Sequence, residues 1–102
     1  MKTQIFHITD PDAQREEIQA AAEIIRRGGL LGIPTETVYG LGANGLNTQA
    51  VTHIFEAKGR PQDNPLILHI PSASWLTRYC RNVPPTAYEL ARRFWPGPLT
   101  MI

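Results

Sequence analysis

The stretch that most constrains this chain spans residues 30–42 and has the sequence LLGIPTETVYGLG. Its first residues are apolar, as in short buried strands, and Pro34 marks the end of the run because proline cannot donate to a sheet ladder. Polar side chains follow at once, and they are Thr35, Glu36, Thr37 and Tyr39. Polar groups just beyond the carboxyl end of a strand lie where open α/β sheets bind ligands. We therefore predict a strand over residues 30–33 followed by a ligand-binding loop; the alternative is a strand followed by a polar turn.

The residues before this stretch predict a β-α-β order. Residues 4–8 are a strand candidate, and a helix is predicted over residues 11–27. Asp10 is its expected N-cap, with Pro11 at the first helical position. A Gly-Gly pair ends the helix just before the strand over residues 30–33. This order favours a sheet with a crossover helix.

The residues after the stretch predict further helices and strands. In order, these are a helix over residues 49–58 capped by Asn47 or Thr48, a strand over residues 66–70, a short helix that Ser72 caps and that runs through Tyr79, and a helix over residues 86–95 that Pro84-Pro85 opens. Residues 99–102 begin as a strand after a Pro-Gly-Pro breaker. A chain of 102 residues suffices for one small α/β domain, but its last strand only begins. We therefore expect a fragment of a larger domain.

A basic loop precedes the predicted strand over residues 66–70. Lys58 offers a point charge, and Arg60 a planar fork that matches phosphate or carboxylate groups. Two prolines stiffen the loop, and the Asn64 amide adds a donor and an acceptor. These features suit an oligophosphate ligand. The alternative to ligand binding is that both cations only stabilise the negative end of the preceding helix's dipole. This explains Lys58 better than Arg60, because Gly59 has already ended the helix.

Composition excludes several classes of protein. The formal net charge is only +1, so a nucleic-acid footprint would have to be local. No apolar run approaches the roughly 20 residues of a membrane-spanning helix, and the N-terminus lacks the build of a signal peptide. Cys80 is the single cysteine, which precludes an internal disulfide and suits the cytoplasm. We expect a cytoplasmic protein without membrane contact.

The remaining chemistry-bearing residues give no motif of their own. His7, His53 and His69 lack metal-ligand spacing with one another or with Cys80, so we predict no metal site. His69, in a predicted strand, is by itself more typical of a packed histidine than of a catalyst. Glycine fingerprints for nucleotides and nucleophile motifs are also missing.

The paired arginines near the end of the chain have two interpretations. Arg92 and Arg93 fall in the last turn of the predicted helix over residues 86–95, where the helix dipole favours cations. We favour this structural interpretation over a phosphate contact.

Three sequence blocks together resemble one family. They are PTETVYGLG at residues 34–42, KGRPQDNPLILHI at residues 58–70 and WPGPLT at residues 95–100. In this order and spacing they are similar to the motifs of the YrdC-like threonylcarbamoyl-adenylate synthases. The resemblance extends from the first helix to Ile102, and the family's catalytic domain is about twice this length. It implies that residues 1–102 are the N-terminal part of a YrdC-like domain, an α/β fold with a twisted, open mixed sheet and flanking helices.

The resemblance also implies a reaction. L-Threonine, bicarbonate and ATP would give threonylcarbamoyl-AMP and pyrophosphate. Mg²⁺ would accompany the ATP, and the protein would need no tightly bound cofactor. A tRNA-modifying threonylcarbamoyl transferase complex would then pass the group to an adenosine of tRNA. The missing second half of the domain carries further site residues, so we expect this chain alone to be poorly active.

Individual roles follow from the resemblance, residue by residue. Thr37 matches the threonine that contacts the amino-acid substrate; Thr35 lies beside it, and Tyr39 would wall the pocket. His69 matches a histidine near the threonine substrate. The paired catalytic cations are matched by Lys58 and Arg60, and the nucleotide contacts by Lys58, Arg60 and Asn64. Fixed cations can neutralise the phosphates during adenylate formation, and much of the remaining catalysis would be positioning.

Two other functions remain open. Related domains bind double-stranded RNA through a basic concave surface, and RNA or tRNA is a second expected partner. The cations available for such a surface are Arg26, Arg27, Lys58, Arg60, Arg78, Arg81, Arg92 and Arg93. The other alternative is a carbamoyl-transferring maturation domain, whose accompanying acylphosphatase and zinc-finger segments do not occur in this sequence.

Overall fold

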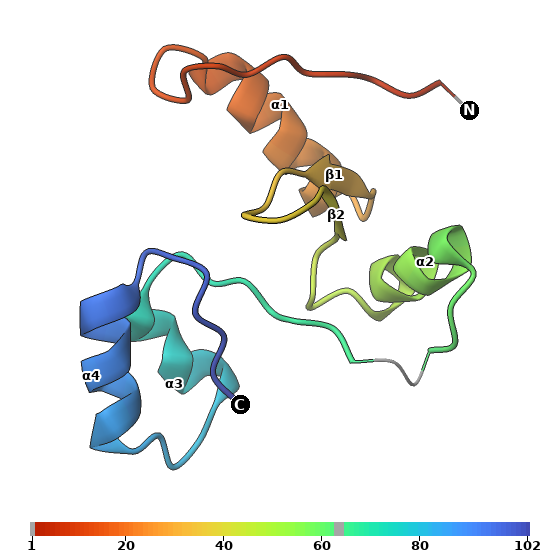
Figure 1. Ribbon diagram of the computed structural model, residues 1–102. Helices are drawn as coiled ribbons and strands as arrows, with labels where there is room; N and C mark the ends of the chain where they lie inside the picture. Colours follow the sequence, from red (N-terminus) through yellow and green to blue (C-terminus); the bar gives the residue numbers. More distant parts are fainter. Residues whose placement is uncertain (1, 63–64) are drawn as a thin grey trace. The chain divides into compact units, whose positions relative to one another are not determined.

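The computed structural model describes residues 2–62 and 65–102 (Figure 1). The chain divides into two compact units, Met1–Asn64 and Pro65–Ile102. The division falls inside the predicted basic loop. As a result, the predicted site residues are shared between two units.

The first helix, α1, spans Arg15–Arg26 and buries Ala21. It begins four residues later than predicted, because Asp10 caps a turn in front of the helix instead of the helix itself. One Asp10 carboxylate oxygen, Oδ1, accepts hydrogen bonds from the backbone N–H groups of Asp12 at 3.1 Å and Ala13 at 3.3 Å. The predicted Gly-Gly stop is confirmed, since Gly28 adopts a left-handed φ of 86°.

The predicted strand over residues 4–8 is wrong. The structure assigns these residues no helix or strand. Gln14 holds the following turn through its side chain: Oε1 accepts from the backbone N–H groups of Thr9 at 2.8 Å and Asp10 at 3.1 Å, and Nε2 donates to the His7 carbonyl at 2.8 Å. A strand needs a neighbouring strand for its backbone groups, and the described residues offer this segment none.

The sheet of the described residues is one antiparallel pair, β1 (Leu31–Ile33) and β2 (Gly40–Gly42). Leu31 lies opposite Gly42, and Ile33 lies opposite Gly40. The predicted β-α-β unit over residues 4–33 is wrong among the described residues, because residues 4–8 form no strand to pair with β1. The connection from β1 to β2 is instead a short hairpin loop, which antiparallel strands permit.

Helix α2 spans Thr48–Lys58 and confirms the helix predicted there. The side chain of Asn47 caps it by accepting a hydrogen bond from the Ala50 backbone N–H at 3.1 Å. Gly59 ends it with a left-handed φ of 63°, after which the Arg60 N–H bonds the Phe55 carbonyl at 2.9 Å. The buried residues of this helix are Ala50, Ile54 and Phe55.

The second unit is helical. A 3₁₀ turn, η1 (Ala73–Trp75), leads into α3 (Leu76–Tyr79), and α4 spans Pro85–Phe94. Ser72 Oγ accepts from the Ser74 N–H at 3.3 Å, and a proline starts α4, so both predicted helices are confirmed. Leu76 and Ala91 are the buried residues of these helices.

The strands predicted in the second unit are wrong. Residues 66–70 and 99–102 form neither helix nor strand. The Leu99 carbonyl accepts a hydrogen bond from Trp95 Nε1 at 2.8 Å, which ties the chain back toward the end of α4. A cis peptide bond joins Trp95 and Pro96 in the same turn.

Candidate functional site

The loop between β1 and β2 is organised by one hydroxyl group. Thr35 Oγ1 accepts hydrogen bonds from the backbone N–H groups of Thr37 and Val38, each at 3.2 Å. It also donates to the Val38 carbonyl and lies 3.4 Å from Thr37 Oγ1. A threonine side chain that bonds the backbone two and three residues onward fixes a turn locally. Thr35 therefore sets the position of Thr37.

This loop borders a shallow surface cavity of about 230 Å³. Its lining residues are Pro34, Thr35, Thr37, Val38 and Tyr39. Of the predicted site residues, the structure thus brings together Thr35, Thr37 and Tyr39. Tyr39 is 82% exposed, so in this chain the cavity is open to water. Its hydroxyls suit a small polar molecule, and its lining includes no cation to hold a phosphate.

The predicted cations lie at the end of α2 and not in this lining. Lys58 occupies the last turn of α2, and Arg60 follows the terminating Gly59. Both side chains are exposed to solvent. They are available to an anionic ligand, but water weakens any cation–phosphate contact that they make on the isolated chain.

The two remaining predicted site residues are His69 and Asn64. His69 lies in the second unit and is exposed. Asn64 lies outside the described residues. The hydroxyl loop and the two cations therefore belong to the first unit, and His69 to the second.

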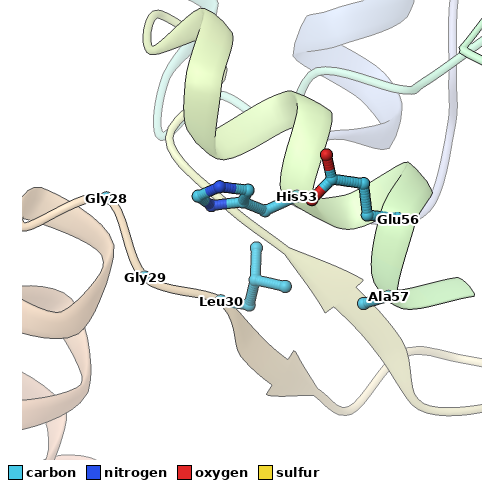
Figure 2. Close-up of a pocket in the computed structure, with 6 residues that line it drawn as sticks. All are labelled: Gly28, Gly29, Leu30, His53, Glu56 and Ala57. Atoms are coloured by element: carbon cyan, nitrogen blue, oxygen red, sulfur yellow. The ribbon is translucent and has the colours of Figure 1, made fainter.

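A second cavity, which sequence reasoning missed, lies between the α1–β1 turn and α2. It measures about 660 Å³, and its lining residues are Gly28, Gly29, Leu30, His53, Glu56 and Ala57. In Figure 2 the imidazole of His53 extends from α2 toward Leu30. The only available signal was the spacing of His53 and Glu56, three apart on one helix face. Without Lys or Arg in its lining, this cavity fits an apolar group better than a nucleotide phosphate.

The described residues contain no group of three or more His, Cys, Asp or Glu side chains placed to hold a metal ion. A Mg²⁺ ion that enters with ATP is held largely by the substrate's own phosphates. Among residues 2–62 and 65–102, every helix is too short or too polar to span a membrane.

Several of the arginines considered for RNA have local partners. Arg26 pairs with Glu23 at 3.3 Å, and the guanidinium of Arg78 lies 4.0 Å from the centre of the Trp75 ring.

Glu89 holds both arginines at the end of α4. Its carboxylate bonds Arg92 at 2.6 Å and Arg93 at 3.0 Å. Hydrogen bonds from Arg92, and then from Arg93, lower the pKa of Glu89 below its ordinary value of 4.5. These pairs support the structural interpretation of Arg92 and Arg93, because a phosphate would have to compete with Glu89 for them.

Known sequences match most of this chain. The family model Sua5/YciO/YrdC, described as telomere recombination, matches residues 23–102. Threonylcarbamoyl-AMP synthases of Pyrococcus abyssi and Bacillus subtilis are 58% and 54% identical over 86 residues, which cover 84% of this chain and 25% of each relative. A putative threonylcarbamoyl-AMP synthase of Mycobacterium tuberculosis is 36% identical over 100 residues, which cover 98% of this chain and 46% of the relative. The chain thus spans a quarter to about half of the length of these relatives.

Solved structures match the fold. A double alanine variant of P. abyssi Sua5 has a TM-score of 0.79 and 56% sequence identity, over 82% of this chain and 26% of that chain. The crystal structure of P. abyssi Sua5 complexed with L-threonine has a TM-score of 0.78 at the same identity, over 82% of this chain and 25% of that one. These likenesses confirm the predicted α/β class and YrdC-like fold. Since the family model also covers the chain from Glu23 to Ile102, this protein belongs to the Sua5/YciO/YrdC family.

Proposed function

We propose that residues 1–102 are the N-terminal part of a YrdC-like domain that works as a threonylcarbamoyl-AMP synthase. The observation that carries the proposal is the hydroxyl-lined cavity of the β1–β2 loop, which Thr35 organises. It lies in a chain that is 56% identical to a protein crystallised with L-threonine. The relatives' shared name, threonylcarbamoyl-AMP synthase, supports the same reaction.

The proposed reaction joins three small molecules. The amine of L-threonine and bicarbonate form a carbamate with loss of water. A carbamate oxygen then bonds to the α-phosphorus of ATP, and the bond to the leaving pyrophosphate breaks. The products are threonylcarbamoyl-AMP and pyrophosphate. Because the enzyme supplies no covalent intermediate, its task is to hold the reactants together and to offset phosphate charge.

The residues that we propose to bind threonine are those of the loop and, from the resemblance of its sequence block to the family, His69. The Thr37 hydroxyl contacts the amino acid, Thr35 holds the loop in shape, and Tyr39 forms a wall. His69 contributes an imidazole, which can donate to or accept from the polar ends of threonine.

The proposed nucleotide site is cationic. Because the lining of the loop cavity includes no cation, the ATP phosphates need Lys58 and Arg60 from the end of α2, assisted by Asn64. Arg60 can bind a phosphate through two parallel hydrogen bonds, whereas Lys58 acts as a point charge. Mg²⁺ enters with ATP and shares the phosphate charge. The product then serves a tRNA-modifying threonylcarbamoyl transferase complex in the cytoplasm.

The test is mass-spectrometric detection of threonylcarbamoyl-AMP from L-threonine, bicarbonate, ATP and Mg²⁺. It uses two proteins: this chain, and a chimaera of P. abyssi threonylcarbamoyl-AMP synthase in which residues 23–102 of this chain replace the residues that correspond to them. We expect little product from the chain alone and clear product from the chimaera. Thr37→Ala and Arg60→Ala should each remove most of it.

Arg27→Ala is the matched control, because it removes an exposed cation from outside the proposed site. It should leave the yield of product nearly unchanged. A folded chimaera that makes no product would refute the synthase proposal, and equal losses with Arg27→Ala and Arg60→Ala would refute the assigned cation.

A further inference from the structure

The turn that joins β2 to α2 (Figure 1) contains an Asn-Gly pair, Asn44-Gly45. Two hydrogen bonds define this turn. The Asn44 carbonyl accepts from the Asn47 N–H at 3.0 Å, and Asn44 Oδ1 accepts from the Leu46 N–H, also at 3.0 Å. The second bond makes an Asx turn, which folds the Asn44 side chain back along the main chain. The side-chain amide carbon, Cγ, and the Gly45 backbone nitrogen are therefore members of one hydrogen-bonded ring.

The Gly45 backbone nitrogen is available as a nucleophile. Among residues 2–62 and 65–102, no hydrogen bond engages its N–H. Gly45 is exposed to solvent, so base can reach this proton, and glycine has no side chain to crowd the nitrogen. The Leu46 N–H already donates to Asn44 Oδ1, the oxygen that gains negative charge when a nucleophile attacks Cγ. A donor placed in advance at such an oxygen stabilises the developing charge.

We propose that Asn44-Gly45 is a site of spontaneous deamidation. The Gly45 nitrogen loses its proton to base and attacks Cγ of Asn44. A bond from this nitrogen to Cγ forms, the bond from Cγ to Nδ2 breaks, and Nδ2 takes up a proton and leaves as ammonia. The product is a cyclic succinimide. Water then opens the ring at either carbonyl, which leaves aspartate or isoaspartate at position 44.

Each of the other asparagines lacks one of the requirements for this reaction. Asn47 and Asn82 precede threonine and valine, whose β-branched side chains crowd the attacking nitrogen. The Asn47 side chain is also held as the cap of α2. Asn64 precedes proline, whose nitrogen carries no proton to lose. The sequence and the turn together therefore single out Asn44.

The two products differ in their effect on α2. Aspartate can keep both hydrogen bonds of the turn, and a negative charge near the N-terminus of a helix is favourable. Isoaspartate routes the main chain through the side-chain carbons and adds a methylene group to it, so neither bond keeps its geometry. Because Asn47 both closes this turn and caps α2, isoaspartate loosens the start of α2. This inference does not rest on the proposed reaction.

Peptide mapping by mass spectrometry tests the site. The folded chain is incubated at pH 8 and 37 °C, and deamidation is followed at each asparagine beside the same chain unfolded in guanidinium chloride. We expect Asn44 of the folded chain to deamidate about 10-fold faster than Asn47 and Asn82, or more, because it lacks a β-branched neighbour. The rate should rise with pH, since the Gly45 nitrogen must first lose its proton.

Gly45→Ala is the matched variant, because it adds only a methyl group beside the attacking nitrogen. Among the described residues, the glycines with a left-handed φ are Gly28 and Gly59, so alanine suits the backbone at position 45. The variant should deamidate about 10-fold more slowly, as expected when a side chain crowds the nitrogen. An Asn44 that stays intact in the folded chain would overturn the proposal, whatever happens in guanidinium chloride. Equal rates with and without Gly45→Ala would also overturn it.

The effect on α2 has its own measurement. Electron-transfer fragmentation distinguishes isoaspartate from aspartate, and hydrogen exchange of the α2 amides is compared between the purified isoaspartate form and Asn44→Asp. Faster exchange in the isoaspartate form alone is expected, and equal exchange in both would overturn the link to the α2 cap. Since peptide mass and exchange are the readouts, failure here is distinguishable from failure of the synthase proposal.

Discussion

Thr35→Val removes the hydroxyl that organises the β1–β2 loop while keeping the shape of the side chain nearly constant. The Thr35 hydroxyl accepts from two backbone N–H groups, those of Thr37 and Val38, and donates to the Val38 carbonyl. Valine fills the same space and can make none of these bonds. We expect the substitution to loosen the loop and to leave the β1–β2 pair intact.

The size of the effect follows from these three hydrogen bonds. Each exposed hydrogen bond contributes about 0.5–1 kcal/mol net, so the loss amounts to about 1.5–3 kcal/mol of preference for the ordered loop. This lowers the equilibrium constant for ordering the loop by a factor of about 10 to about 160. If threonine binds only the ordered loop, its apparent affinity falls by up to the same factor. The KM for L-threonine should rise accordingly while kcat changes little.

Two measurements check this expectation. The first is the KM for L-threonine of the chimaera that carries residues 23–102. The second is hydrogen exchange of the Thr37 and Val38 amides in this chain alone, which should accelerate without any substrate or activity. Thr35→Ser is the matched control, because it keeps the hydroxyl and removes only the methyl group. Unchanged exchange in Thr35→Val would refute the reasoning, as would equal effects of serine and valine.

Three further substitutions or conditions have defined outcomes. Asn47→Ala should destabilise the first unit by about 1 kcal/mol, because it removes the cap on the Ala50 N–H; the exchange rates of α2 amides report the loss, and Asn47→Asp should retain most of the stability. Gly97→Ala should destabilise the second unit, because the new Cβ would lie 2.5 Å from the Phe94 carbonyl oxygen. Urea unfolding followed by tryptophan fluorescence reports on this unit, since both tryptophans lie in it. An unchanged midpoint of unfolding would contradict the prediction. An NMR titration of Glu89 should give a pKa below 4.5 that rises in 1 M NaCl, because salt screens the two arginines. Since folding lowers this pKa, the stabilisation from Arg92 and Arg93 is present above about pH 4.5 and is lost as the pH falls through the folded-state pKa. A pKa that does not change with salt would contradict the ion-pair origin.

The elements that sequence predicted well are those whose limits depend on neighbouring residues alone. Asn47 at the start of α2, Gly59 at its end and the proline at the start of α4 each act within a few residues. The predicted strands over residues 4–8 and 66–70 depend instead on a partner elsewhere. Their sequences carry strand propensity, but propensity does not form a ladder without a second strand.

The candidate site divides in the same way. Thr35, Thr37 and Tyr39 lie within five residues of one another, so a single loop brings them together and the sequence motif was sufficient to find them. The second cavity was missed because the α1–β1 turn and α2 are distant in sequence, and no pattern relates Leu30 to His53. The position of His69 relative to the loop depends on the packing of separate units, which local sequence patterns do not encode.

The two cations at the end of α2 are not equivalent, and this difference bears on how the nucleotide site should be tested. Lys58 lies in the last helical turn, where its positive charge interacts favourably with the negative end of the helix dipole and so stabilises α2. Arg60 lies beyond the left-handed Gly59, and its backbone N–H already bonds the Phe55 carbonyl. The Arg60 backbone is therefore fixed by the helix end, while its guanidinium contributes less to the helix than the Lys58 ammonium does. A loss of product in Arg60→Ala reports on phosphate binding with little disturbance of α2, whereas a loss in Lys58→Ala combines phosphate binding with helix stability.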